Sequence, residues 1–349
     1  MIPALSDNIL TTSVTQRIEP LPAGVERPLW SVMIPTFNGT KYLPQALESI
    51  LAQDPGPENM QIEVVDDAST EDDPLQVVNA LAPGRVEFYR NPKNLGLMRN
   101  FNSCIRRSRG KLVHILHQDD YVEVGFYASV QEAFESSCNC AIIFTRVFFV
   151  DDKNRSQGIS EYCDALRVES NDPRNFMTSN PVRFPGVVVR REFYERSGGF
   201  DPTLVHTGDW EMWVRATLHG GGRMLDQPLA YYRWSLSNAT NRQARSAEHL
   251  RDCLRLAEKW KRENLPGFDR NSFDRAVVQF ALGEWRRFRA LGDYQAAAAN
   301  YAFWRSHARA LDRLRAARDD AWAYLSIKLV KSSAKTILNK ARIRQLRRH

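Results

Sequence analysis

The sequence predicts an α/β protein in which helices cover both faces of a mainly parallel sheet, followed by a helical region. Between residues 30 and 150, short apolar runs alternate with segments of helical periodicity, a pattern typical of β-α-β units. From about residue 247 onward the strand-like runs cease, and Ala, Leu, Arg and Glu recur at helical spacing. The 349 residues exceed the roughly 250 to 300 of a usual single core, so we expect one large domain with an appended region.

The expected elements follow one another in a regular order. Strand-like apolar runs occupy residues 30–35, 62–65, 86–89, 112–116 and 141–150. Helical spacing occurs in residues 42–51, 74–81 and 97–107. The residues before the first run contain several prolines and show no periodicity. We therefore expect three segments, a leader (1–29), a principal domain (30–244) and a basic helical region (245–349).

Ligands bind to such sheets beyond the carboxyl ends of the strands, so the polar residues after each run are the candidates for a site. Two adjacent carboxylates, Asp66 and Asp67, follow the second run. A carboxylate at this position can accept hydrogen bonds from a ribose hydroxyl or a nucleobase imide. In the alternative interpretation, Asp67 or Ser69 only caps the next helix.

A second acidic pair, Asp119 and Asp120, follows the fourth run and has no Lys or Arg close by in the sequence. Adjacent carboxylates repel each other unless a cation or hydrogen-bond donors lie between them. Carboxylate oxygens suit Mg²⁺ or Mn²⁺, which complete their coordination with water and substrate phosphates. We expect His117 to support this site from outside the ion's ligands, because a neutral imidazole suits softer metals.

A third acidic group, Asp209, precedes a stretch in which Trp210, Trp213 and Val214 share one helical face. This spacing places Asp209 in the first turn of a helix, where the helix dipole favours an anion. The alternative is that Asp209 is only the N-cap of that helix.

Six segments strongly resemble the family 2 glycosyltransferases of the GT-A fold, which are inverting enzymes that use nucleotide sugars. In sequence order they read VMIPTFN, VVDDAS, NLGLMRN, HQDD, SGGFD and GDWEMW. The resemblance covers residues 30–234 and implies a Rossmann-like GT-A sheet. It also implies transfer of a sugar from a nucleotide-diphosphate donor to an acceptor hydroxyl in one displacement.

The resemblance implies roles for individual residues. The donor-binding residues would be Pro35, Thr36, Phe37, Asp66, Asp67, Arg99, Asn100 and Asp119. Phe37 would stack on the nucleobase, and Asp120 would bind the Mn²⁺ or Mg²⁺ ion that bridges the diphosphate. Asp209 falls at the position of the catalytic base.

Three positions depart from the family pattern. Gly208 stands where a Glu usually precedes the base, although one carboxylate within reach of the acceptor hydroxyl suffices for proton transfer. Glu211 is the reserve candidate for the base. His117 stands where relatives often have another Asp, and the pair Tyr232 and Arg233 lacks the His that often follows it. The last two departures predict weaker metal binding.

The two ends of the chain differ in charge. Residues 245–349 carry 24 Lys and Arg against 11 Asp and Glu, and residues 321–349 contain basic, aromatic and aliphatic residues but no acid. A cationic helix of this composition can lie on an anionic membrane, which would suit a lipid-linked acceptor. The alternative is a helix packed on the catalytic domain with its charges in solvent. No nucleic-acid-binding module is apparent, so no nucleic-acid partner is expected.

Three classes of function remain open at this point. The first is an active glycosyltransferase of surface polysaccharide or lipopolysaccharide synthesis, with a saccharide or lipid-linked acceptor. The second is a nucleotidyltransferase, which the absence of a Gly-rich phosphate loop after the first strand disfavours. The third is a protein that binds nucleotide sugars without turnover. No secretory signal or apolar stretch near 18 residues is apparent, so we expect a cytoplasmic protein, if anything at the inner face of the membrane.

Overall fold

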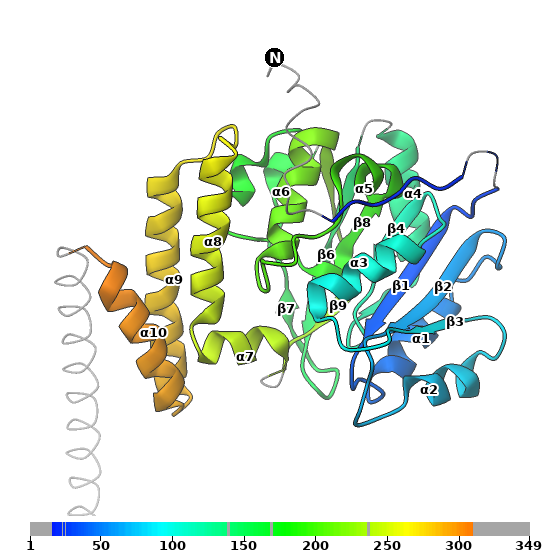
Figure 1. Cartoon of the computed structure of the whole chain (residues 1–349), viewed down its shortest axis with the longest axis horizontal. Helices are drawn as coiled ribbons and strands as arrows, with labels where there is room; N and C mark the ends of the chain where they lie inside the picture. Colours follow the sequence, from blue (N-terminus) through cyan, green and yellow to red (C-terminus); the bar gives the residue numbers. More distant parts are fainter. Residues whose placement is uncertain are drawn as a thin grey trace, which may run out of the picture. The chain divides into compact units, whose positions relative to one another are not determined.

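The computed structural model describes residues 16–22, 24, 26–137, 140–167, 170–235 and 238–309 of the chain (Figure 1). The chain divides into two compact units, with the division between Val277 and Val278. Residues 321–349, for which the sequence suggests a membrane contact, lie outside the described residues. In the described part, no helix combines the length and the apolar character needed to cross a membrane.

A nine-stranded sheet forms the centre of the first unit (Figure 1). Its strands are β1 (Trp30–Thr36), β2 (Met60–Asp66), β3 (Glu87–Arg90), β4 (Leu112–Ile115), β5 (Tyr121–Val122), β6 (Ile142–Val150), β7 (Ser156–Ile159), β8 (Val187–Arg190) and β9 (Gly222–Arg233). They lie in the order β3-β2-β1-β4-β8-β6-β9-β5, and β7 pairs with β6 beside this path.

The two halves of the sheet differ in strand direction. Strands β3, β2, β1 and β4 are parallel to one another, as alternating strands and helices predict. Strand β8 runs antiparallel to both β4 and β6, whereas β6 and β9 are parallel. The α/β class is confirmed, and the parallel arrangement is continuous only in the first half.

Helices cover the two faces of the parallel half. Val32 and Ile34 of β1 point into a cluster that includes Leu47 of helix α1 (Leu43–Leu51) and Phe126 of helix α4 (Phe126–Ser136). Successive side chains of a strand point to opposite faces, so Met33 belongs to the other face. Helix α3 (Leu97–Arg107) contacts β1, β2 and β4 and lies over that second face (Figure 1).

The described part of the chain contains ten α-helices, and those at residues 126–136 and 191–197 are among the ones that the sequence did not predict. They are α1 (Leu43–Leu51), α2 (Pro74–Leu81), α3 (Leu97–Arg107), α4 (Phe126–Ser136), α5 (Arg191–Ser197), α6 (Gly208–Gly220), α7 (Ala239–Arg245), α8 (Glu248–Arg262), α9 (Arg270–Ala290) and α10 (Tyr294–His307). The predictions for residues 74–81 and 97–107 match α2 and α3 residue for residue. The expected helical region after residue 247 is confirmed in the described residues.

Part of the expected leader packs on the first unit. Ile18 is fully buried, and the carbonyl of Gln16 accepts a hydrogen bond from the Gly199 amide at 2.8 Å. The guanidinium of Arg27 donates to the carbonyls of Arg109 and Gly110 at 2.9 Å each. These contacts attach the segment before β1 to the turns that follow α3 and α5.

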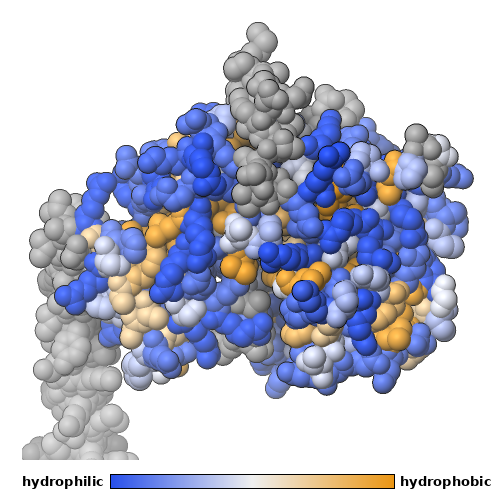
Figure 2. Space-filling model, viewed as in Figure 1, coloured by the Kyte–Doolittle hydropathy of each residue, from blue (hydrophilic) through white to orange (hydrophobic). Residues whose placement is uncertain are grey.

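The second unit has aromatic packing of its own. Trp285 of α9 lies 4.8 Å from Tyr301 and 6.2 Å from Trp304 of α10, measured between ring centroids. Figure 2 shows mostly hydrophilic residues on the displayed face, with apolar residues in separate patches. Phe280, Leu291 and Tyr294 are large apolar side chains of this unit that remain exposed.

Candidate active site

The carboxyl ends of β1, β2 and β4 meet at one edge of the sheet, and this edge gathers polar segments from three loops. Thr36 stands beside Asp66 in the parallel register, and the Asp67 amide donates to the Thr36 carbonyl at 2.8 Å. Strand β4 pairs with β1 on the other side, so residues 117–120 leave the sheet next to residues 36–38.

Gln118 fixes the loop that follows β1. Its Oε1 accepts hydrogen bonds from the Thr36 hydroxyl at 2.5 Å and from the Phe37 amide at 2.8 Å. A Cβ added at Gly39 would lie 1.9 Å from this Oε1, so any other residue there would displace the side chain of Gln118. Pro35 is buried in β1, whereas Phe37 remains 42% exposed. Gln118 was not among the predicted site residues, although it lies inside the HQDD segment.

Asp66 orders the turn that follows β2. Its carboxylate is 0% exposed and accepts hydrogen bonds from the hydroxyl of Ser69 at 2.5 Å and from Nε of Arg90 at 2.5 Å. The next helix is capped by the side chain of Asp73. The alternative interpretation of Asp67 or Ser69 as the cap of α2 is therefore wrong.

Asp67 holds the loop that precedes α3. Its Oδ1 accepts hydrogen bonds from the side chain of Asn91 and from the Leu95 amide, both at 2.9 Å, and its Oδ2 accepts from the Gly96 amide at 2.9 Å. The side chain is buried, and protein donors reach both of its oxygens. These contacts hold the loop in place. Because they occupy both oxygens of Asp67, they do not favour the predicted direct contact of Asp67 with the donor.

Asn100, like Asp67, is buried and forms hydrogen bonds to other parts of the protein. Its Nδ2 donates to the Val65 carbonyl at 3.1 Å, and its Oδ1 accepts from Asn91 at 2.9 Å, so the amide joins α3 to the sheet. Asn100 is 3% exposed, whereas the side chain of its neighbour Arg99 is exposed. Of the two predicted donor-loop residues, only Arg99 presents its side chain to solvent.

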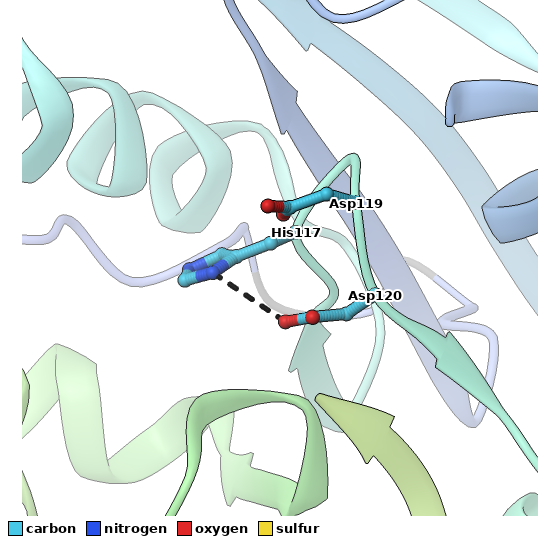
Figure 3. A group of neighbouring side chains, drawn as sticks. All are labelled: His117, Asp119 and Asp120. Carbon is cyan, nitrogen blue, oxygen red and sulfur yellow. Dashed lines mark ion pairs between the residues drawn. The ribbon is translucent and has the colours of Figure 1, made fainter. Parts of the chain in front are cut away.

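The metal-binding candidates meet after β4, where His117, Asp119 and Asp120 place one ligand atom each within 4.8 Å of one another (Figure 3). Oδ1 of Asp120 accepts a hydrogen bond from the Arg233 amide at 2.8 Å. Its Oδ2 is buried and has no hydrogen-bond partner in the described part of the chain. Burial raises the pKa of Asp119, and burial together with the charge of Asp119 raises the pKa of Asp120 well above its usual range. A buried carboxylate oxygen without a donor fits a cation.

His117 lies closer to this group than the sequence suggested. Its Nδ1 is 3.7 Å from Oδ2 of Asp120, and Figure 3 shows the two side chains facing each other. The ring stacks on Phe101 at 5.2 Å and contacts Phe184 at 4.3 Å, measured between centroids. Burial lowers the pKa of His117 to about 4, so the ring is neutral near pH 7. A neutral imidazole has a lone pair for a metal, which favours Mn²⁺ over Mg²⁺.

Arg233 joins this acidic pair to the rest of the sheet. Besides its amide contact with Asp120, its Nε donates to the Asp119 carbonyl at 3.0 Å. The guanidinium also donates to Gln45 and Asn154, both at 2.7 Å. Its partners lie up to 188 residues away in the sequence, so spacing alone could not reveal this role.

Asp209 is the second residue of α6, as the sequence predicts. The N-cap is Thr207, so the interpretation of Asp209 as the cap is wrong. Oδ1 of Asp209 accepts a hydrogen bond from the Trp210 amide at 2.6 Å, and its Oδ2 lies 3.5 Å from Nδ2 of Asn180. Burial raises the pKa of Asp209, and the proximity of His206 offsets this only in part. A raised pKa strengthens a carboxylate as a general base.

Glu211 does not qualify as the reserve base. Its two oxygens pair with Nε and Nη2 of Arg215 at 2.9 and 3.0 Å, and the side chain is 2% exposed. Burial by itself would raise the pKa of Glu211, but the charges of Arg215 and Lys259 outweigh it and lower that pKa. The spacing of four residues between Glu211 and Arg215 was the sequence signal for this structural pair.

Gly208, the residue before Asp209, fits its surroundings. A Cβ added at Gly208 would lie 2.6 Å from Sδ of Met98 on α3. A glutamate at this position would collide with Met98 unless that side chain moved. The departure from the family's acidic pair is therefore matched by the packing of α3 against α6.

Arg183 connects the environments of the two acidic groups. Its Nη1 donates to the carbonyl of Asn180 at 2.8 Å. Burial raises the pKa of Tyr232 to about 12, with a further contribution from the charge of Asp120, and Arg183 opposes the raised pKa of both Tyr232 and Asp209. The charge of Arg183 therefore acts on Asp209 and on Tyr232, the residue whose pKa the charge of Asp120 also raises.

Comparison with known proteins points to one family. Residues 31–197 match the model of the family described as glycosyl transferase family 2. An uncharacterized protein of Mycobacterium tuberculosis is 29% identical over 241 residues, which cover 66% of this chain and 75% of that protein. An uncharacterized glycosyltransferase of Methanocaldococcus jannaschii is 22% identical, over 55% of this chain and 65% of that protein. A poly(ribitol-phosphate) beta-N-acetylglucosaminyltransferase of Staphylococcus aureus, TarS, is 33% identical over 103 residues, 27% of this chain and 16% of TarS.

Solved structures show the same fold. Residues 1–349 of S. aureus TarS in complex with UDP superpose with a TM-score of 0.51 at 18% identity, covering 74% of this chain and 72% of that one. The mannosyltransferase PcManGT from Pyrobaculum calidifontis, in complex with GDP-Man and Mn²⁺, gives a TM-score of 0.53 at 18% identity, covering 91% of this chain and 85% of that one. The fold class expected from the resemblance, GT-A with a C-terminal helical region, is confirmed.

Proposed function

Because the chain is a glycosyltransferase of family 2, we propose that it transfers a sugar from a nucleotide-diphosphate donor to an acceptor hydroxyl with inversion at the anomeric carbon. The observation that carries this proposal is the buried Oδ2 of Asp120 beside His117 and Asp119, an oxygen that has no hydrogen-bond partner among the described residues. A second carboxyl group, that of Asp209, has a raised pKa. One centre can hold the leaving group while the other takes a proton.

The residues after β4 would hold a divalent cation. Asp120 would be its main ligand, with Asp119 and His117 as neighbours that complete the group. A bound Mn²⁺ or Mg²⁺ ion would supply positive charge for the departing diphosphate. The amide and guanidinium of Arg233 fix the backbone and carboxylate of this pair, which preserves the spacing of the ligands.

Asp209 would act as the general base. It must be ionised to take the proton of the acceptor hydroxyl, and its raised pKa strengthens it as a base. The contacts with Trp210 and Asn180 orient the carboxylate. The acceptor oxygen would then attack the anomeric carbon from the face opposite the nucleotide, without a covalent intermediate.

The donor nucleotide would lie on the loops after β1, β2 and β4. Phe37 offers an exposed ring for stacking on the base, and Gln118 holds its backbone in place. Arg99 extends an exposed guanidinium from α3 toward solvent and is a candidate contact for the diphosphate. In this proposal Asp66, Asp67 and Asn100 shape the loops around the donor.

The acceptor belongs to a surface polymer in this proposal. TarS is described as a poly(ribitol-phosphate) transferase, and a further relative of Bacillus subtilis as a minor teichoic acid biosynthesis protein. The second of these is 25% identical over 155 residues, or 43% of this chain and 17% of that protein. We propose a saccharide or lipid-linked acceptor of the same broad kind.

The test is release of nucleoside diphosphate from a panel of UDP-, GDP- and dTDP-sugars, with and without Mn²⁺ or Mg²⁺. The panel is repeated with saccharide and lipid-linked acceptors, and donor binding is measured in parallel by calorimetry. We expect one donor to turn over only with a divalent cation, faster in Mn²⁺ than in Mg²⁺ because of His117. The rate should rise further with the correct acceptor.

A second outcome would support a different function. The loss of the usual acid at position 208 is the feature that favours a protein that binds nucleotide sugars without turnover. Saturable donor binding without release of nucleoside diphosphate, across the acceptor panel and both ions, would favour that alternative and contradict the proposed transfer.

A further inference from the structure

Helix α8 (Glu248–Arg262) begins after both the family match, which ends at residue 197, and the expected domain boundary at residue 244. It places two buried charged side chains, Asp252 and Lys259, against the segment that carries Asp209. We propose that α8 positions the catalytic base and that Asp252 is the main positioning residue. This inference rests on the proposed role of Asp209.

Asp252 anchors the backbone directly before α6. Its Oδ2 accepts hydrogen bonds from the amides of His206 and Thr207 at 2.8 Å each, and from the Thr207 hydroxyl at 3.0 Å. Its Oδ1 accepts from Arg255 at 2.9 Å, and the residue is 0% exposed. Displacing this carboxylate would leave several buried donors unpaired, which is costly, so the position of Thr207 is fixed.

Lys259 holds the two ends of the same segment. Its Nζ lies 3.7 Å from Oδ2 of Asp201, before the turn, and 3.8 Å from Oε1 of Glu211, after the base. It also pairs with Glu263 of its own helix end at 2.9 Å. One buried cation thus faces carboxylates on both sides of Asp209.

The two charged residues act from one face of α8. Asp252 and Lys259 are seven residues apart, a spacing that places side chains on the same side of a helix. The fully buried Leu256 lies between them on that face. Trp260 packs edge to face on Trp210, the residue after the base, with ring centroids 5.7 Å apart. The helix therefore contacts the base-bearing segment before, beside and after Asp209.

Asp252 can affect the reaction only through the segment that it holds. It is buried with both oxygens engaged, so it offers no group to a substrate. Misplacing a reacting group by about 1 Å can cost about a hundredfold in rate. The donor loops after β1 and β4 do not contact Asp252 through any of these bonds. A loosened anchor should therefore lower kcat and leave the KM for the donor nearly unchanged.

The experiment compares Asp252→Asn with Arg255→Gln in the full chain. Both changes remove one side of the same ion pair, but only Asp252→Asn weakens the anchor of residues 206 and 207. We expect kcat to fall by roughly ten- to a hundredfold in Asp252→Asn, with the donor KM and the calorimetric donor Kd within twofold of wild type. Arg255→Gln should stay within twofold in all three quantities.

A second pair of variants covers the case in which Asp252→Asn fails to fold. Thr207→Val removes the hydroxyl donor with little change in shape, and Thr207→Ser keeps it. The inference requires a larger loss of kcat in Thr207→Val than in Thr207→Ser, again at constant donor KM. Unchanged kcat in folded Asp252→Asn, or equal kcat in the two Thr207 variants, would overturn it. An absence of transfer in the wild-type protein would contradict the proposed function itself, whereas the outcomes above contradict only the role of α8.

Discussion

The carboxylates on the two sides of the site differ in how fully the protein satisfies them. On the donor side, Asp66 and Asp67 are buried and receive hydrogen bonds from protein donors on both oxygens. On the reaction side, Oδ2 of Asp120 has no described partner, and Oδ2 of Asp209 has only a long contact to Asn180. Burial raises the pKa values of Asp120 and Asp209.

The difference distinguishes aspartates that order the backbone from aspartates that are proposed to take part in the reaction. A buried carboxylate whose two oxygens both receive hydrogen bonds orders the backbone around it. A buried carboxylate oxygen without a donor favours a metal ion or a proton. All four acids lie near the ends of strands or helices. Only the contacts supplied by distant parts of the chain tell the two kinds apart.

The largest expected effect comes from Asp209→Asn. The amide keeps the shape of the side chain but cannot accept the proton of the acceptor hydroxyl, so transfer should fall by about 10² to 10⁴-fold. Donor binding should stay within twofold. The matched control is Asp226→Asn, at an exposed aspartate on β9. Steady-state transfer rates and calorimetry measure both quantities, and an active Asp209→Asn variant would exclude Asp209 as the base.

Asp120→Asn should have the next largest effect. It removes the negative charge of the carboxylate but can keep the contact with the Arg233 amide. We expect the Mn²⁺ concentration for half-maximal activity to rise by at least roughly 10 to 100-fold, since the loss of a group that only supports a metal ligand already costs this much in metal affinity. A metal titration of activity measures the change. The prediction is wrong if the variant keeps the metal dependence of wild type.

Asp67→Asn should act mainly on stability. The amide cannot accept from both the Leu95 and the Gly96 amides while keeping its bond to Asn91, so at least one buried donor loses its partner. The free energy of unfolding should fall by about 1 to 3 kcal/mol. Denaturant unfolding measures this loss. A fall in the kcat of Asp67→Asn as large as that of Asp209→Asn would contradict the distinction between the donor-side and the reaction-side carboxylates.

The smallest expected effect is a shift in the pH profile. The base works only when ionised, so the rate of wild type should fall as the pH falls through the raised pKa of Asp209. Asn180→Asp places a second negative charge beside Oδ2 of Asp209 and raises that pKa further. The acidic limb of the kcat profile should therefore move to higher pH. Asn171→Asp, at an exposed position, is the control. Identical acidic limbs of the kcat profile in the two variants would refute the contact between position 180 and Asp209.

Local periodicity was sufficient to predict the parallel half of the fold. The strands at residues 30–36 and 60–66 and the helices α2 and α3 each contain their own apolar pattern. The other half of the sheet was harder to predict, and its strand β5 has only two residues. Strand β9 is irregular as well, since its register with β6 shifts at Arg146. Short or irregular strands form through pairing with distant partners, which no local pattern records.

The acidic residues of the site were predictable from their place after strands, but their supports were not. Gln118 reaches Thr36 across 82 residues, and the Arg233 amide reaches Asp120 across 113. Asp252 contacts Thr207 across 45 residues. The sequence thus indicated which carboxylates gather at the sheet edge. Which of them keep an oxygen without a described donor depends on such long-range contacts, as the contrast between Asp67 and Asp120 illustrates.

The most direct test of the account is the anomeric configuration of the product. Once the donor panel has identified a substrate pair, proton NMR of the first product formed gives the configuration at the transferred carbon. A single displacement assisted by Asp209 predicts inversion relative to the donor. Retention of configuration would contradict the account, because it would require a nucleophile or a reaction path that the proposed roles of Asp120 and Asp209 do not include.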